Sequence, residues 1–280
     1  MITTDPSSRT GPSDPSADVD LRPRLIVAGA TGRLGTALVA EAARLGFPIV
    51  GGIGRTPSTI ASVRGDGTIP ILPLSGLPTL LGQGQVYLSA MTPEAEIAAL
   101  PQVAQAGLPA VVATTGIGDE GNHVVRCAAR TIPIVVEANF SIGAQLLFRL
   151  LRALGPLPAE YDLSLTEVHR REKRDHPSAT AVAVAEALAA SGVERWEEAQ
   201  GRRTPGTLEI ASVRAGDSPG THTVLIAGPH ESLRVEHQAF GRAAFAGGML
   251  ASARWLAATP ARPPGVYGLA DVLASRGARP

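Results

Sequence analysis

The sequence contains a single cysteine, Cys127, among its 280 residues, and this excludes a disulfide within the chain. A metal site built from cysteine ligands is disfavoured for the same reason. Cys127 lies in a segment with helical spacing, where we expect a packed thiol rather than a nucleophile. The six histidines show no metal-ligand spacing, so we predict no metal site.

Long apolar runs and net charge are also missing. No segment reaches the ~18 apolar residues that a membrane span needs. The formal net charge is +0, so neither a membrane nor a nucleic acid is expected as a partner. Residues 1–22 are rich in Ser, Asp, Pro and Thr and lack the apolar core of a signal peptide. We therefore predict a disordered extension on a cytoplasmic protein.

From Arg24 onward the chain alternates short apolar runs with helical segments. Because parallel strands are joined through crossover helices, this pattern predicts an α/β fold, a Rossmann-like doubly wound parallel sheet with helices on both faces. The predicted strands are 24–28, 48–53, 84–90, 110–114 and 133–137, and the predicted helices are 32–45, 93–106 and 119–130.

The pattern changes after Asn139, where strand-like segments follow one another. Strands in succession predict a second α+β domain with a mixed sheet. Its predicted elements are helices 143–154 and 178–191 and strands 161–169, 207–214, 221–228 and 232–240. We expect helix 242–258 and the tail to return to the first domain. The predicted division is thus a dinucleotide-binding domain of 23–138 and 242–280, and a substrate-binding and oligomerisation domain of 139–241.

A glycine-rich turn follows the first predicted strand. Arg24-Leu-Ile-Val-Ala28 runs directly into Gly29-Ala-Thr-Gly32-Arg-Leu-Gly35, and helical spacing follows. Glycines in such a strand–turn–helix unit allow the tight turn and the close approach of a pyrophosphate. The spacing is G-x-x-G-x-x-G rather than G-x-G-x-x-G. We predict dinucleotide binding here; the alternative is an ordinary glycine-rich βα turn.

The second predicted strand lacks the acid that accepts from the ribose 2′-hydroxyl of NAD. No Asp or Glu lies between Glu41 and Asp66, and Arg55 follows the strand instead. A guanidinium there suits a 2′-phosphate, so the sequence favours NADPH, with NADH as the alternative cofactor. The competing interpretation is a surface arginine in a turn.

The stretch from Glu167 to Thr180 concentrates His169, Arg170, Arg171, Lys173 and Arg174 before a predicted helix. A proton donor, several cations and a helix N-terminus together suit an anionic small molecule that must be protonated. An imidazole is the natural donor, because its unperturbed pKa is ~6.5. The alternative interpretation is a solvated charged loop before a capped helix.

These motifs together resemble the dihydrodipicolinate reductase family from Leu25 to Leu273. The family pattern E-x-H-H-x-x-K-x-D-x-P-S-G-T-A corresponds to the stretch 167–181, G-T-T-G to 113–116 and A-N-F-S-x-G to 138–143. Three blocks at 205–207, 214–217 and 220–222 and a closing block at 245–256 are also similar.

The resemblance implies a role for each matching residue. His169 would donate the proton and Lys173 would bind substrate as a cation. The implied cofactor contacts, together with Arg55, are Gly29, Thr31, Gly32, Arg33, Leu34, Thr114, Gly116, Ala138, Asn139 and Phe140. The implied substrate contacts are Thr115, Arg170, Ser178, Ala179, Thr180 and Arg242.

The chain departs from the family pattern at four places. Arg170 replaces the second histidine, Ala179 the glycine before threonine, Ala113 the first glycine of G-T-T-G, and Ser89-Ala-Met91 the D-F-T/S segment. An arginine cannot deliver a proton near neutral pH, although it can clamp a carboxylate.

The resemblance implies an NADPH-dependent reductase of a small, anionic cyclic imine: 4-hydroxy-tetrahydrodipicolinate reductase of the diaminopimelate route to lysine. It also implies a homotetramer or homodimer. One alternative is a diverged imine reductase acting on a related substrate in specialised metabolism, which Arg170, Ala179 and Ser89-Ala-Met91 leave open. A second is a non-catalytic nucleotide-binding regulator, which the presence of His169 and Lys173 disfavours.

Overall fold

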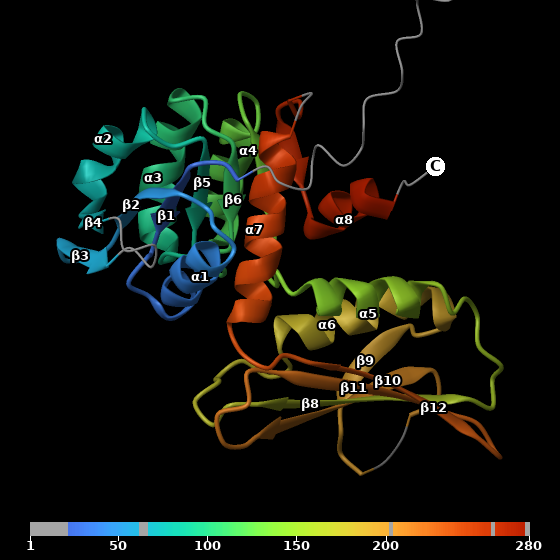
Figure 1. Cartoon of the computed structure of the whole chain (residues 1–280). Helices are drawn as coiled ribbons and strands as arrows, with labels where there is room; N and C mark the ends of the chain where they lie inside the picture. Colours follow the sequence, from blue (N-terminus) through green and yellow to red (C-terminus); the bar gives the residue numbers. More distant parts are fainter. Residues whose placement is uncertain (1–21, 62–66, 202–203, 259–260, 278–280) are drawn as a thin grey trace, which may run out of the picture.

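A computed structural model of the chain describes residues 22–61, 67–201, 204–258 and 261–277. The predicted N-terminal extension falls almost entirely outside the described residues. Two sheets lie one above the other, and the long helix α7 (Ala243–Ala257) connects them (Figure 1). Among the described residues no helix combines the length and apolarity needed to cross a membrane.

The first sheet has eight strands in the order β13-β7-β6-β5-β1-β2-β4-β3. Its pairings are parallel except that β3 runs antiparallel to β4. The strands are β1 (Leu25–Ala28), β2 (Ile49–Ile53), β3 (Ser58–Ala61), β4 (Thr68–Leu72), β5 (Val86–Ser89), β6 (Ala110–Val112), β7 (Pro133–Val136) and β13 (Gly265–Tyr267).

Helices cover both faces of this sheet because its strands carry apolar residues on both sides. Leu25 and Val27 of β1 join the core beneath α1, α7 and α8, while Ile26 and Ala28 join the core beneath α2, α3 and α4. These helices are α1 (Arg33–Arg44), α2 (Leu77–Leu81), α3 (Pro93–Gln105), α4 (Gly118–Ala128) and α8 (Leu269–Gly277), with the 3-10 turn η2 (Leu74–Gly76) before α2.

The second sheet is mixed, with the order β12-β11-β8-β10-β9. Helices α5 and α6 lie on one of its faces (Figure 1). Residues of β8 alternate between buried and partly exposed, as expected for a sheet with one covered face. The elements are α5 (Ile142–Arg152), β8 (Asp162–His169), α6 (Ala179–Ala187), η3 (Ala189–Ser191), β9 (Arg195–Glu198), β10 (Thr207–Arg214), β11 (Thr221–Ala227) and β12 (Ser232–Gln238).

The predicted fold class is confirmed, with corrections of detail. The sequence pattern did not indicate β3, β4, β9, β13, α2 or α8, which are short or lie in segments without clear periodicity. The predicted helix 178–191 ends at Ala187 and gives way to η3. Cys127 is exposed on α4, with its Sγ 3.5 Å from His123 Nε2, so the expectation of a packed thiol was wrong.

The last segment of the chain lies against the first sheet. Strand β13 pairs in parallel with β7, and α7 packs on α1 and on β5 and β6. Helix α7 also contacts α5 of the second sheet. The predicted domain limits themselves stay a prediction.

Candidate functional site

The glycine turn after β1 has the close packing that a phosphate-binding turn requires. Gly29 has φ of 77°, and a Cβ there would lie 2.3 Å from the Ala90 carbonyl oxygen. A Cβ at Gly35 would lie 1.9 Å from the Gly29 carbonyl oxygen, so helix α1 can approach the turn only without a side chain. Gly32 is the N-cap of α1 and offers no side-chain cap, which leaves backbone N–H groups for a ligand.

The other predicted cofactor residues around this turn face solvent. Thr31, Gly32 and Arg33 are exposed and Leu34 is half-buried. Arg55 is exposed just after β2, the strand that pairs with β1. Both positions therefore follow the carboxyl ends of adjacent parallel strands, where ligands of doubly wound sheets bind.

The segment after β6 also lies at this carboxyl edge. Thr115 and Gly116 are exposed, whereas Thr114 is only 6% exposed. The Thr114 hydroxyl donates to Glu96 Oε2 at 2.7 Å and accepts from the Met91 N–H at 3.2 Å. Its side chain is therefore used inside the protein, and Thr115 and Gly116 are the residues that present this segment to a ligand.

The segment after β7 links the two sheets. Asn139 Nδ2 donates to Thr180 Oγ1 of α6 at 2.9 Å, and Asn139 Oδ1 accepts from the Ser141 N–H. Ala138 is exposed, while the Phe140 side chain is 2% exposed and belongs to the core below α7. The carboxyl edge of the first sheet thus lies next to the start of α6.

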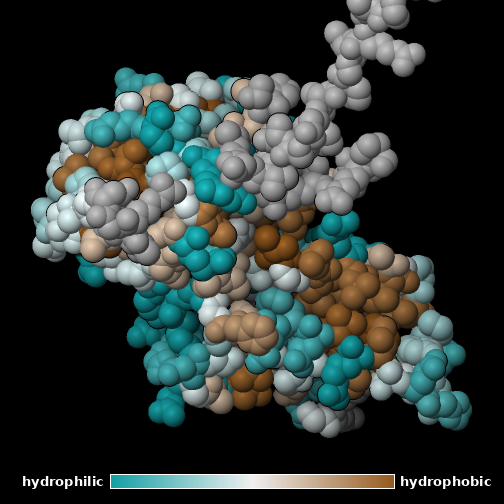
Figure 2. Space-filling model, in the orientation of Figure 1, coloured by the Kyte–Doolittle hydropathy of each residue, from teal (hydrophilic) through white to brown (hydrophobic). Residues whose placement is uncertain are grey.

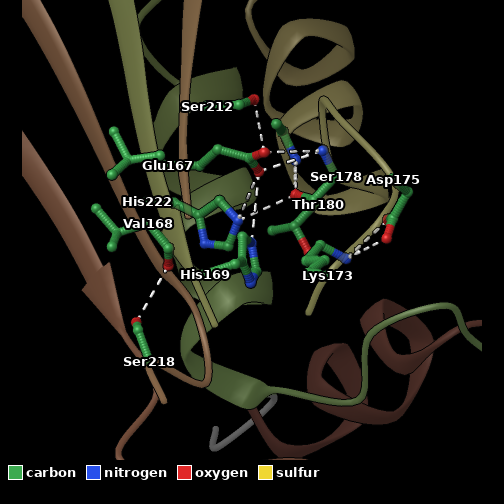
Figure 3. Close-up of polar contacts among 12 residues, drawn as sticks. Glu167, Val168, His169, Lys173, Asp175, Ser178, Thr180, Ser212, Ser218 and His222 are labelled. Carbon is green, nitrogen blue, oxygen red and sulfur yellow. Dashed lines mark hydrogen bonds and ion pairs between the residues drawn. The ribbon is translucent and has the colours of Figure 1, made fainter. Parts of the chain in front are cut away.

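Glu167 is the centre of the polar network in the second sheet (Figure 3). Its carboxylate is fully buried on β8. Oε1 accepts from Ser212 Oγ at 2.8 Å and from Arg214 Nη2 at 3.1 Å, and the Ser178 N–H lies 3.2 Å from both oxygens. Burial alone would raise the pKa of Glu167, but these donors and His169 hold it well below its usual range.

His169 ends strand β8 and lies against this carboxylate. Its Nε2 is 3.4 Å from Glu167 Oε2, and the side chain is only slightly exposed. A Cβ at Gly220 would lie 2.9 Å from the His169 ring, so the glycine gives the imidazole its space. The predicted strand 161–169 is found as β8, which ends at the buried His169.

His169 is the first of three imidazoles in a row. His222 meets His169 edge-on with ring centroids 5.1 Å apart, and His237 stacks on His222 at 6.1 Å. Burial lowers the pKa of His222 to about 3, and charge on His169 adds to this effect. Burial also lowers the pKa of His237, whose Nε2 lies 3.0 Å from Ser141 Oγ. His222 is consequently neutral at physiological pH.

Lys173 follows β8 in the basic loop and is paired with Asp175. Its Nζ lies 2.9 Å and 2.7 Å from the two carboxylate oxygens. Arg214 fixes this loop by donating to the carbonyl oxygens of Lys173 and Asp175. Lys173 is thus held beside the His169 site but is not a free cation.

The start of α6 is built around the same carboxylate. Ser178 caps the helix by accepting from the Ala181 N–H, and its own N–H is used by Glu167. Both the N–H and the hydroxyl of Ser178 are therefore used within the protein, and its predicted contact with substrate stays a prediction. Ala179 is exposed and is the residue through which the helix start faces outward. Thr180 is buried and accepts from Asn139.

Arg170 and Arg242, two further predicted substrate residues, differ in how far they are buried. Arg170 is partly buried, and its Nε is buried without a hydrogen-bond partner among the described residues. Arg242 is exposed as the N-cap of α7, between the two sheets.

Potential metal ligands of Glu167, His169 and His222 lie within 4.8 Å of one another. The Arg214 guanidinium already neutralises Glu167 at 3.1 Å. Arg214 would repel a metal cation that bound to the same carboxylate. The geometry therefore favours a pair of histidine and carboxylate over a metal centre.

Three residues of the site escaped assignment from the sequence. Ser212 gave no signal, because a serine in a strand is unremarkable. Arg214 and His222 stand at the edges of blocks 214–217 and 220–222, which carried the family resemblance. Arginine and histidine are suited to binding a buried carboxylate. Arg214 on β10 and His222 on β11 each lie on a strand next to β8, which carries Glu167.

A glycine turn on a doubly wound sheet, joined to a mixed sheet with a buried histidine–carboxylate site, is the architecture of a two-domain oxidoreductase that uses a nicotinamide dinucleotide. The family described as "Dihydrodipicolinate reductase, N-terminus" matches residues 23–140, and "Dihydrodipicolinate reductase, C-terminus" matches residues 143–273. The chain belongs to the dihydrodipicolinate reductase family.

Two curated relatives agree with this assignment. The 4-hydroxy-tetrahydrodipicolinate reductase of Gluconobacter oxydans (strain 621H) is 36% identical over 257 residues, which cover 90% of this chain and 97% of the relative. The enzyme of the same name from Anaeromyxobacter dehalogenans (strain 2CP-1 / ATCC BAA-258) is 33% identical over 271 residues, covering 91% and 99%.

Solved structures share the fold. Dipicolinate-bound dihydrodipicolinate reductase from Paenisporosarcina sp. TG-14 has a TM-score of 0.66 at 19% identity and covers 89% of this chain and 98% of its own. An engineered D-amino acid dehydrogenase bound to NADP+ has a TM-score of 0.51 at 15% identity, covering 90% and 94%.

Proposed function

We propose that the chain reduces 4-hydroxy-tetrahydrodipicolinate with NADPH. The observation that carries the proposal is the hydrogen bond between Asn139 and Thr180. It brings the carboxyl edge of the glycine-turn sheet to the start of α6, where Glu167 organises His169 and the basic loop. A dinucleotide on the first sheet and an anion at the second would therefore meet.

The residues of the first sheet fit a dinucleotide. Gly29, Gly32 and Gly35 form a turn that added side chains would fill, and the start of α1 favours phosphate through its N–H groups and dipole. Arg55 would bind the 2′-phosphate that distinguishes NADPH from NADH. When bound, the reduced nicotinamide supplies a hydride.

The second sheet supplies binding and the proton. Arg170 and the α6 start at Ala179 would hold the substrate carboxylates, and Arg242 would add charge from α7. Lys173 would join them by exchanging its contact with Asp175 for the substrate. Glu167 would fix the orientation of His169, whose Nε2 lies 3.4 Å from its carboxylate. Protonated His169 then delivers the proton that completes reduction.

The overall reaction balances with these parts. The hydroxylated substrate loses water to become a conjugated cyclic imine, and this accepts one hydride and one proton. His169 regains its proton from solvent after each turnover. His222, with its lowered pKa, stays neutral behind His169 and does not compete for that proton.

The proposal is tested by following the hydride. The protein is mixed with freshly generated 4-hydroxy-tetrahydrodipicolinate and NADPH deuterated at the transferable position. Mass spectrometry should find one deuterium in the tetrahydrodipicolinate product. Unlabelled product, or no product beyond the protein-free control, would refute the proposed function.

We also propose that copies of the chain assemble through the second sheet. Helices α5 and α6 cover one face of this sheet (Figure 1), and Val213 and Leu233 in its strands are 43% and 52% exposed. Apolar side chains also gather over α5 (Figure 2), where Leu146 and Leu150 are half exposed. Sedimentation equilibrium should give a tetramer or dimer, which Val213→Lys should dissociate; a monomeric wild type would refute this proposal.

A further inference from the structure

A buried carboxyl group lies beneath the carboxyl edge of the first sheet. Glu96 of α3 is 2% exposed and accepts from two hydroxyls, those of Ser89 and Thr114, through the same oxygen, Oε2. Its other oxygen is buried without a hydrogen-bond partner among the described residues. A charged group this deep is costly unless a specific geometry depends on it.

The network fixes the direction of the Thr114 hydroxyl. The Met91 N–H donates to Thr114 Oγ1 at 3.2 Å, so the hydroxyl proton is left for Glu96 Oε2 at 2.7 Å. Burial raises the pKa of Glu96, and the two hydroxyl donors oppose that effect. In both the ionised and the protonated carboxyl, Oε2 can accept from the hydroxyls of Ser89 and Thr114.

The same network ties together three neighbouring strand ends. Ser89 ends β5, Thr114 follows β6, and the Ala90 carbonyl oxygen abuts Gly29 after β1. The loop that presents Thr115 and Gly116 is therefore anchored through Thr114 to the segment that abuts the glycine turn. The side chains of Ser89, Glu96 and Thr114 are all buried, so we infer that their effect on a ligand is positional.

The family pattern, as it resembles this chain, has an acid at the place of Ser89. Here the strand offers only a hydroxyl, and the carboxyl group arrives from α3 instead. We propose that Glu96 is a positioning residue that replaces a strand-end carboxyl and holds Thr114, so that the 113–116 segment is shaped for the nicotinamide end of the cofactor. This inference rests on the proposed function.

The experiment compares truncation of Glu96 with truncation of an equally buried neighbour. Glu96→Ala and Leu100→Ala each shorten a buried side chain of α3 to alanine, but only the first removes a hydrogen bond to Thr114. Two properties are measured on the full chain: the Kd for NADP+ by calorimetry, and hydrogen exchange of the Met91 amide without any ligand.

Glu96→Ala should weaken NADP+ binding by about tenfold or more and speed exchange at Met91. Leu100→Ala should lower the melting temperature without either change. Glu96→Gln keeps a carbonyl oxygen for both hydroxyls and should remain near wild type. Equal weakening by Leu100→Ala, equal weakening by Glu96→Gln, or wild-type behaviour of Glu96→Ala would each overturn the inference.

A second variant restores the carboxyl group from the strand. An aspartate at 89 is one bond longer than serine, and its carboxyl oxygens would reach from the place of the Ser89 hydroxyl toward Thr114. Ser89→Asp with Glu96→Ala should therefore recover most NADP+ affinity; no recovery would contradict the replacement. If Glu96→Ala does not fold, Thr114→Val tests the same hydrogen bond from the other side. It should weaken NADP+ binding as much as Glu96→Ala is expected to. Unchanged NADP+ binding in Thr114→Val would overturn the inference.

Failure of the inference and of the proposed function are distinguishable. Hydrogen exchange at Met91 reports the anchoring without cofactor or substrate. If wild type does not bind NADP+, the proposed cofactor role fails, whereas the anchoring is still judged by exchange. If wild type binds NADP+ and turns over substrate but Glu96→Ala is unchanged, only the inference fails.

Discussion

The two halves of the site are built by different means. The first sheet offers backbone: Gly29, Gly32 and Gly35 make space, and the start of α1 supplies N–H groups. The second sheet offers buried charge: Glu167 accepts hydrogen bonds from β10 and from the start of α6, and His169 and His222 lie close to it. Backbone sites depend on the absence of side chains, whereas charged sites depend on every partner being present.

This difference explains where the departures from the family pattern lie. In the second sheet, Glu167 and His169 match the pattern, while Arg170 and Ala179 change at positions that are at least partly exposed. In the first sheet the change at Ser89 is buried, and Glu96 compensates for it from α3. In this chain the changes at Arg170 and Ala179 lie where the side chain is at least partly exposed, whereas the buried change at Ser89 comes with a hydrogen bond to Glu96.

The largest expected effect is on the chemical step. His169→Gln keeps a polar side chain but removes the proton donor, so kcat should fall by ~10²–10⁴-fold. NADPH binding belongs to the other sheet, and its Kd should be unchanged. Stopped-flow kinetics and calorimetry check both; near-normal kcat, or lost cofactor binding, would break the division between the two halves.

Buried charge should make the second sheet fragile. Arg214→Met leaves the Glu167 carboxylate without its cation and should cost about 3–5 kcal/mol in the free energy of unfolding. The double variant Arg214→Met with Glu167→Gln should recover part of that loss, because no unpaired charge remains. Urea unfolding is measured for wild type, for Arg214→Met and Glu167→Gln singly, and for the double variant; additive losses would mean that the two side chains do not act as a pair.

The histidine row predicts how stability depends on pH. His222 has a pKa of about 3 in the folded protein, against ~6.5 for an unfolded histidine. The unfolded chain therefore binds the proton first, and stability should fall as pH decreases from ~6.5 toward 3, by up to ~1.4 kcal/mol per pH unit.

His222→Asn should remove the contribution of His222 to the slope of unfolding free energy against pH. His230→Asn changes an exposed histidine and should leave that slope as it is in wild type. Glu167 adds a separate loss at lower pH, since its pKa is lowered and its stabilisation disappears once it is protonated. Unfolding titrations at several pH values give the slopes; identical slopes for wild type and His222→Asn would contradict the assignment.

The smallest effect concerns cofactor choice. Arg55→Ala should lower the ratio of kcat/KM for NADPH over NADH by about tenfold or more, the value of a charge-assisted hydrogen bond. Arg130→Ala is the matched control, because Arg130 is exposed before β7 at the opposite edge of the sheet. An unchanged ratio in Arg55→Ala would remove the case for a 2′-phosphate site there.

Much of the fold was predictable because the glycine turn and the alternation of strands and helices are local patterns. Strands such as β13 were not, because three residues gain their structure only by pairing with β7. Within the site, the basic stretch around His169 and Lys173 could be singled out from the sequence because these residues lie close together along the chain. The hydrogen bonds from Ser212 to Glu167 and from Thr114 to Glu96 join residues far apart in sequence. Local sequence patterns carry no information about such pairs.

The central claim is that both halves act together on the family's substrate despite Arg170 and Ala179. Steady-state kinetics with freshly generated 4-hydroxy-tetrahydrodipicolinate and NADPH tests it most directly. We expect wild type to reach kcat/KM above ~10⁴ M⁻¹s⁻¹. The double variant Arg170→His with Ala179→Gly should have no higher kcat/KM than wild type. Poor turnover by wild type that rises in this double variant would contradict the claim and identify a diverged reductase.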